Sequence, residues 1–330
     1  MEERKKAHIN LAFQSRIDAV DADPRFYYEP LLSAHPLDEF KPFEFAGKTM
    51  RIPVWVSSMT GGTALAGQIN RNLARVCAEF GMGMGLGSCR ILLDDPKNLP
   101  DFDMRAVIGD DSPFYANLGI AQLEHLVKEK STDKIGELVE NLRADGIIIH
   151  INPLQEAFQP EGDILKHPPI ETLQAFLDKS SLRVIVKEVG QGMGPESLKA
   201  LLRMPLQAIE FGALGGTNFT KLELGRHTGG SPSVFSTFGH VGHTSAEMTQ
   251  MVNDIVDETN DIKCNELIIS GGINNVLDGY YLVKVSALKS VLGMGSAFLE
   301  HAMDDYDELK KFAERIKKSL ALAECYLRIR

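Results

Sequence analysis

The segment HINPLQE, residues 150–156, holds the most specific group of chemistry-bearing side chains in the chain. His150 and Asn152 are two residues apart, so on a strand they share one face, and a proline then ends the strand pairing. Gln155 and Glu156 follow at the start of the next loop. A carboxylate beside an amide and an imidazole suits a Mg²⁺ ion that keeps several waters and is shared with substrate phosphates. A Glu156 that only caps the loop is the competing interpretation.

A lysine, Lys187, ends the apolar part of the run VIVKE, which should be buried on both sides. A buried lysine is costly unless it meets an anion or an electron-rich partner. Together with Asn117, Thr60 and Ser88, which follow other apolar runs, it can clamp a polar heterocycle. The ring of flavin mononucleotide (FMN) fits that description. An ion pair of Lys187 with Glu188 or with another carboxylate is the alternative explanation.

Two glycine-rich turns, SGGI at 270–273 and GMGS at 293–296, accompany the last two apolar runs. They bring bare backbone N–H groups and helix N-termini together, which is where barrels commonly bind a phosphomonoester. The nearby Gly216 and Thr217 can add an N–H group and a hydroxyl. In the alternative interpretation, Thr217 and Ser296 only cap helices.

Basic residues gather in two further places. Arg4, Lys5 and His8 lie close together near the N-terminus, where a run of charge is usually just solvated. Arg90 directly follows Ser88 and a cysteine at the predicted end of an apolar run. A guanidinium group there suits bidentate binding of phosphate.

Eight short apolar runs carry these polar segments, and helical patterns separate the runs. Continuous apolar runs of this kind predict parallel strands that are covered on both faces. The predicted strands are 53–58, 82–87, 113–118, 146–151, 182–188, 207–211, 265–270 and 289–294. Helical periodicity is clearest at 63–80, 133–144, 195–203, 244–258 and 276–288.

Eight such units, with no break in composition, predict an α/β fold of the TIM (β/α)8 barrel type rather than a two-domain wound sheet. We expect a single FMN-binding barrel domain over residues 1–330. Within it, 1–50 form an N-terminal arm and lead-in, 53–303 the barrel, and 304–330 a C-terminal helix. A Gly/Ser/His-rich insertion occupies 212–243. Because chemistry in such barrels lies where strands end and βα loops begin, the polar segments should meet at one mouth.

Composition narrows the function classes. The chain has 330 residues, 44% of them hydrophobic, which excludes a disordered or fibrous protein. Its 35 basic and 45 acidic residues give a formal charge of -10, which argues against nucleic-acid and membrane partners. The 4 cysteines show no CxxC spacing, and the start of the chain lacks the apolar stretch of a signal peptide. We therefore expect a cytoplasmic protein.

Taken together, these motifs resemble the type 2, flavin-dependent isopentenyl-diphosphate isomerases over essentially the whole chain. HxNPLQE and KEVGxG are specific when they occur together, whereas GGT and SGGI also occur in other phosphate-binding barrels. The shared motifs are RKxxH (4–8), SMTGG (58–62), INRNLA (69–74), GS-x-R (87–90), NLG (117–119), H-x-NPLQE (150–156), QPEGD (159–163), KEVGxG (187–192), GGT (215–217) and SGGI (270–273).

The resemblance implies an enzyme that interconverts isopentenyl and dimethylallyl diphosphate with reduced FMN and Mg²⁺. NADPH would reduce the FMN without being consumed in each turnover, and we expect a homo-oligomer. By matching position, the implied flavin contacts are Ser58, Met59, Thr60, Ser88, Asn117, Lys187 and Thr217, with the flavin phosphate at Gly272, Ile273, Asn274, Gly295 and Ser296. The implied substrate contacts are Arg4, Lys5, Arg90, His150, Asn152 and Gln155. Gln155, His150 and Lys187 would be catalytic, and Glu156 would be the metal ligand.

The chain departs from the family pattern at several positions. Gly212 stands where Ser or Ala is common, Phe219 where Trp is usual, and His243 within a usual Gly-Ile-Pro-Thr pattern. The segment that begins with Asn274 and Asn275 carries extra residues before GMGS. Two other function classes remain open at this point. One is another FMN barrel oxidoreductase, such as a 2-hydroxy-acid oxidase, which needs a His/Arg pair for its carboxylate substrate. The other is a non-catalytic barrel that binds a phosphoester.

Overall fold

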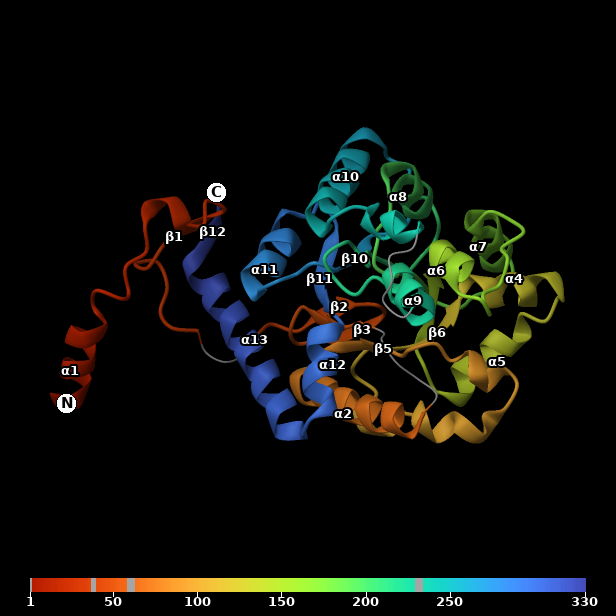
Figure 1. Ribbon diagram of the computed structural model, residues 1–330, viewed down its shortest axis with the longest axis horizontal. Helices are drawn as coiled ribbons and strands as arrows, with labels where there is room; N and C mark the ends of the chain where they lie inside the picture. The colour runs from red at the N-terminus through yellow and green to blue at the C-terminus, as the bar shows by residue number, and fades with distance from the viewer. Residues whose placement is uncertain (1, 37–39, 58–62, 229–233) are drawn as a thin grey trace.

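The computed structural model describes residues 2–36, 40–57, 63–228 and 234–330. Within these residues eight parallel strands form a closed barrel, in which β11 pairs back with β4, and helices surround it (Figure 1). Each strand overlaps one of the eight predicted runs, so the predicted TIM barrel is confirmed. The barrel strands are β4 (Val54–Val56), β5 (Gly83–Gly85), β6 (Phe114–Gly119), β7 (Gly146–Ile151), β8 (Val184–Glu188), β9 (Ala208–Glu210), β10 (Glu266–Ser270) and β11 (Lys289–Met294).

The helices lie between and after these strands. The five helices that the periodicity predicted are present as α2 (Ala64–Phe80), α5 (Asp133–Asn141), α8 (Pro195–Leu202), α10 (Ser245–Glu258) and α11 (Val276–Val285). The others are α1 (Glu2–Leu11), α3 (Arg105–Ile108), α4 (Ile120–Lys128), α6 (Pro153–Phe158), α7 (Pro169–Leu177), α9 (Phe219–Thr228), α12 (Ser296–Met303) and α13 (Tyr306–Tyr326), with 3₁₀ helices η1 (Ala19–Asp21), η2 (Arg90–Leu93), η3 (Pro96–Asp101) and η4 (Ser236–His240). Among the described helices, none is long and apolar enough to cross a membrane.

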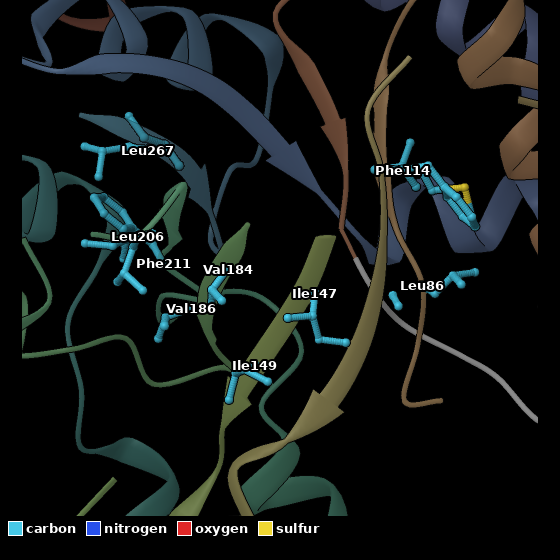
Figure 2. Packing of buried hydrophobic residues seen from close by; sticks show 14 of the residues in the cluster. Leu86, Phe114, Ile147, Ile149, Val184, Val186, Leu206, Phe211 and Leu267 are labelled. Atoms are coloured by element: carbon cyan, nitrogen blue, oxygen red, sulfur yellow. The ribbon is translucent and has the colours of Figure 1, made fainter. Parts of the chain in front are cut away.

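Alternation along the strands divides the core into two clusters. Odd and even positions of a strand point to opposite faces, and here both faces are apolar. Ile147 and Ile149 of β7 and Val184 and Val186 of β8 belong to the outer cluster under the helices (Figure 2). Ile148, between the first two, belongs to a second cluster inside the barrel. This double burial explains why the strands are continuous apolar runs in the sequence.

A short antiparallel hairpin, β2 (Phe43–Phe45) and β3 (Lys48–Met50), closes the N-terminal end of the barrel. Phe45, Ala46 and Met50 are fully buried in the interior cluster. The backbone N–H of Ala46 donates to Glu266 Oε2 at 2.8 Å, and the hydroxyl of Tyr115 donates to the carbonyl of Ala46 at 2.9 Å. Residues 43–50, expected as part of an irregular lead-in, are therefore the floor of the barrel.

The residues before this hairpin form an arm outside the barrel. Strand β1 (Phe26–Tyr28) pairs antiparallel with β12 (Leu327–Ile329), which follows α13 at the end of the described chain. The predicted C-terminal helix is thus α13, ending at Tyr326, followed by a short strand. Helix α1 extends beyond α13, on the side away from the barrel (Figure 1).

Candidate active site

A polar layer lies directly above the apolar interior of the barrel. Interior cluster residues are Trp55, Tyr115, Ile148, Ile185, Ala208, Ile268 and Val291. Two residues further along each of these strands, on the same face, the chain has Ser57, Asn117, His150, Lys187, Glu210, Ser270 and Gly293. The strands are parallel, so this second layer forms one polar surface at the carboxyl end of the barrel, where TIM barrels place their chemistry.

A hollow opens above this layer. Its walls come from the loops after β8, β9, β10 and β11. Six of the predicted cofactor residues line it together: Lys187, Thr217, Gly272, Ile273, Gly295 and Ser296. Five residues of the polar layer line it as well, namely Ser57, Lys187, Glu210, Ser270 and Gly293.

Glycines make one end of the hollow a bare backbone cradle. Gly272 has φ +67°, and a Cβ atom there would lie 2.5 Å from the carbonyl oxygen of Leu214. Gly215 has φ +99°, and its Cβ would lie 2.6 Å from the Cα of Gly272. Two GG turns therefore pack backbone against backbone, which no other residue type permits. Helix α12 begins beside them at Ser296, and this combination of free N–H groups and a helix N-terminus favours a phosphate.

Lys187 is 6% exposed and projects from β8 into the polar layer. Its Nζ donates to the backbone carbonyl of Glu188 at 3.1 Å. The Glu188 carboxylate serves a different purpose, because its Oε2 accepts the backbone N–H groups of Gly190, Gln191 and Gly192 at 2.6–2.8 Å. Among the described residues, no carboxylate forms an ion pair with Lys187 within 4.0 Å. The lysine is therefore available to a ligand in the hollow.

His150 is held in a neutral, oriented state. Its Nδ1 lies 2.7 Å from Oδ1 of Asn117. When the amide oxygen accepts from Nδ1–H, Nε2 is left as a hydrogen-bond acceptor. Burial, reinforced by the positive charges of Lys187 and Arg90, lowers the pKa of His150 to about 3. The ring is consequently uncharged at neutral pH.

The residues after β7 form one hydrogen-bonded group. The Nδ2 atom of Asn152 donates to Gln155 Oε1 at 3.1 Å and to Glu156 Oε1 at 3.0 Å. The other oxygen of Glu156 accepts the backbone N–H of Asp163 at 2.8 Å. Gln155 Nε2 in turn reaches Oε1 of Glu223 at 3.4 Å. Each carboxylate oxygen keeps a further lone pair for a cation, although the described residues hold no group of three acidic, His or Cys ligands.

Comparison with known proteins shows which family the chain is related to. It is 31% identical over 305 residues to the isopentenyl-diphosphate delta-isomerase of Rickettsia felis, spanning 91% of this chain and 85% of that protein. It is 32% identical over 278 residues to the protein of the same name from Rickettsia peacockii, spanning 83% and 78%. The chain belongs to the isopentenyl-diphosphate delta-isomerase family. The resemblance found in the motifs is thereby confirmed, and with it the expectation of an isomerase.

Solved structures share the fold of this family member at low sequence identity. A mandelate oxidase variant with (S)-mandelic acid superposes with a TM-score of 0.59 at 14% identity, over 91% of this chain and 82% of that chain. A flavocytochrome b2 variant with bound sulfite gives a TM-score of 0.58 at 15% identity, over 91% and 71%. These likenesses establish the barrel fold. No protein-family profile matches the chain.

Several residues predicted for this isomerase lie apart from the hollow. Arg4 and Lys5 are exposed on α1, far from the barrel. Ser88 and Arg90 are exposed after β5, and Arg90 lines a neighbouring hollow with Gln122 and Asp163. Asn274 is exposed and does not line the glycine cradle. Ser58, Met59 and Thr60 lie outside the described residues.

Two acidic residues beside the predicted site, Glu210 and Glu223, escaped the motif search, and Glu188 was considered only as a partner of Lys187. Glu210 is 0% exposed in the polar layer, Glu223 supports Gln155, and Glu188 holds the loop after β8. A signal for Glu210 exists in the sequence, because the run AIE places a charge two residues after an interior alanine. The same alternation identifies Lys187 in the run VIVKE. Glu223 carries no comparable signal, since it lies on a helix whose position depends on the fold.

Proposed function

We propose that the protein interconverts isopentenyl and dimethylallyl diphosphate and that it uses reduced FMN and Mg²⁺. Membership of the family supports the substrate, because relatives carry that activity in their name. The observation that carries the cofactor is the single hollow that joins a glycine cradle to the buried Lys187. A ligand with a phosphate at one end and a polar ring at the other fills both parts at once.

FMN fits this hollow on the chemistry of its walls. The cradle at Gly215 and Gly272 leaves no room for a Cβ, as expected where backbone N–H groups approach a phosphate. At the other end, Ser57 Oγ and Glu210 Oε2 are buried, and neither has a hydrogen-bond partner within 3.5 Å among the described residues, although the two groups are close enough for Ser57 to lower the pKa of Glu210. Buried polar atoms are nearly always satisfied, so these two point to a polar ligand. Thr217, Ile273, Gly295 and Ser296 complete the phosphate end.

The geometry of three side chains supports the catalytic roles that we propose. Reduced FMN, when bound, supplies the acid–base group for moving the double bond. Lys187 would contact the ring of the bound flavin and would favour negative charge on it. Neutral His150 presents Nε2 as an acceptor, and Gln155, tied to Asn152 and Glu223, orients the substrate beside it. The overall reaction adds one proton to an alkene carbon and removes one nearby, so no electrons are lost.

The substrate diphosphate would lie outside the ring, next to the group at β7. Glu156 is the proposed Mg²⁺ ligand, with water and diphosphate oxygens filling the remaining positions. Arg90 can reach the diphosphate from the loop after β5. Arg4 and Lys5 can reach it only if the arm moves or if they come from a second copy of the chain, because α1 lies away from the mouth.

We also propose a homo-oligomer in the cytoplasm, acting in isoprenoid biosynthesis with NADPH as reductant of the flavin. The arm supports the oligomer, since it exposes a series of large apolar side chains that a partner surface would cover. These are Ile9, Leu11, Phe13, Ile17, Val20, Leu31 and Leu32. Sedimentation of the unaltered protein and of a Phe13→Asp, Ile17→Asp double variant tests the idea. A smaller assembly for the variant is expected, and a monomer in both cases would refute it.

The experiment that tests the function uses the purified protein with FMN, NADPH, Mg²⁺ and isopentenyl diphosphate. We expect dimethylallyl diphosphate to appear in the NMR spectrum without stoichiometric loss of NADPH. A flavin-loaded protein that forms no product would contradict the proposal. Oxygen consumption with a 2-hydroxy acid would instead favour an oxidase, and phosphoester binding without any turnover would favour a binding protein.

A further inference from the structure

Glu210 is a charged residue at the centre of the barrel to which no motif assigns a role. It ends β9, is 0% exposed, and is the register partner of Lys187 on β8. Both side chains line the hollow that ends at the glycine cradle. A glutamate in such a place is rare, because burying a carboxyl group is costly unless something compensates.

The hydrogen bonds of Glu210 leave half of its carboxyl group free. Oε1 accepts from the hydroxyl of Ser270 at 3.4 Å, close to the limit of a hydrogen bond. Oε2 is buried and has no hydrogen-bond partner within 3.5 Å among the described residues, although the Ser57 hydroxyl lies close enough to lower the pKa of the carboxyl group. An unpaired buried polar atom costs about 1–3 kcal/mol. The free oxygen is explained if a ligand in the hollow supplies its partner.

The surroundings of Glu210 act on its pKa in opposite directions. Burial raises the pKa of the carboxyl group, whereas the positive charge of Lys187 on β8 and the hydroxyls of Ser57 and Ser270 lower it, and the net shift is upward. β10 contributes Ser270 and the segment after β4 contributes Ser57, neither of which is charged. On β7 the nearest titratable group is His150, whose lowered pKa keeps it neutral. Lys187 is therefore the one charge facing this carboxyl group among the described residues of the polar layer.

We propose that Glu210 contacts the bound flavin ring beside Lys187 and takes up a proton when that ring becomes negatively charged. The inference rests on the proposed function, because it needs FMN in the hollow. With oxidised FMN, the ionised Glu210 and the charged Lys187 neutralise each other. Reduction adds a negative charge next to this pair, and in a medium of low polarity an added charge is strongly unfavourable. Protonation of Glu210 restores neutrality.

The number of protons taken up when the bound FMN is reduced tests this proposal. Dithionite donates two electrons to the bound FMN, one proton from water goes to the flavin, and a second goes to the Glu210 carboxylate. The slope of the midpoint potential against pH counts these protons. Around neutral pH we expect two protons per two electrons for the unaltered protein and one for Glu210→Gln. The readout needs no isoprenoid substrate and no turnover.

Two further variants make the result specific. Glu210→Asp keeps a titratable group, so it should retain two-proton uptake with the change of slope displaced along the pH axis. Glu266→Gln removes another buried carboxylate, 8% exposed at the opposite end of the barrel, and should keep the unaltered slope even if its melting temperature falls. One-proton uptake by the unaltered protein, or two-proton uptake by Glu210→Gln, would overturn the inference. An unaltered protein that fails to bind FMN would overturn the proposed function itself.

Discussion

The two ends of the barrel are built from the same strands but differ in their role. One end stabilises the fold, and the other forms the proposed ligand site. At the N-terminal end, apolar side chains and the β2–β3 hairpin fill the interior completely. At the carboxyl end, a layer that begins only two residues later is polar and opens into a hollow. One step of strand alternation therefore separates the part that stabilises the fold from the part that binds a ligand. Variants at the two ends should consequently change different measurable quantities.

The hairpin end is also where the backbone is under visible strain. Its two-residue turn has Ala46 at φ +50° and Gly47 at φ +75°. A turn of this type matches the twist of the strands but favours Asn-Gly, because alanine is disfavoured at positive φ. The buried hydrogen bonds to Glu266 and Tyr115 hold Ala46 in place. Strain here supports the packing of the barrel floor and takes no part in ligand binding.

The largest effect is expected for Phe45→Ala at the hairpin end. Phe45 is 0% exposed and packs edge-on against Trp55, with ring centroids 6.5 Å apart. Removing a buried phenyl ring should lower the free energy of unfolding by about 3–5 kcal/mol. Urea denaturation measures this loss. The folded fraction should keep its affinity for FMN, and a selective loss of FMN binding would break the proposed division between the ends.

At the carboxyl end, Glu156→Gln should reduce turnover by about a hundredfold, which corresponds to about 2.7 kcal/mol. The amide keeps the size of the side chain but loses the charge that binds Mg²⁺. Initial rates measured against Mg²⁺ concentration should show saturation displaced to much higher concentration. Superimposable curves for the two proteins would mean that Glu156 acts only as a cap for Asn152 and Asp163.

Lys187→Ala should lower activity by more than tenfold, or about 1.4 kcal/mol, while the fold survives. The lysine has no carboxylate partner within ion-pair distance in the described structure, and the neighbouring Glu210, whose pKa is raised, can become neutral by protonation when Lys187 is removed. Steady-state rates and the melting temperature should be measured together. A lowered melting temperature with normal turnover would show that Lys187 stabilises the fold and does not bind the ligand.

Tyr115→Phe provides the smallest and most selective change. It removes only the hydroxyl that donates to the carbonyl of Ala46 at 2.9 Å. Because that contact is buried, the free energy of unfolding should fall by about 1 kcal/mol. Turnover and FMN affinity should stay unchanged, although Tyr115 and the polar residue Asn117 are only two positions apart. A change in turnover would show that the two ends are coupled through β6.

Much of the fold follows from the sequence because double burial makes the barrel strands distinctive. The segments 147–149 and 184–186, around Ile148 and Ile185, are apolar at consecutive positions, and the number and spacing of such runs predicted the barrel. The hairpin at 43–50 could not be predicted in this way. Its strands, FEF and KTM, each contain a charged residue, so they form no continuous apolar run. Its stability comes from Glu266 and Tyr115, which are distant in sequence.

The site was predictable where its residues form compact motifs. Gly272, Thr217 and Lys187 were selected from separate segments, and they line one hollow. Glu223 was not, because its relation to Gln155 joins positions 68 residues apart on α9 and α6. The basic cluster on the arm shows a second limit of prediction from sequence, which concerns position. Its charges can be read from the sequence, but where the arm lies depends on weak contacts that no periodic pattern encodes.

The pairing of β1 with β12 ties the first part of the chain to the last. Three residues at each end share this ladder, and the carbonyl of Tyr326 also accepts the backbone N–H of Glu29. The base of the arm is therefore anchored by residues that follow α13. Shortening the chain by its last four residues would release this anchor without touching the arm itself. Loss of these C-terminal residues would then displace the N-terminal arm, as a change in the arm itself would.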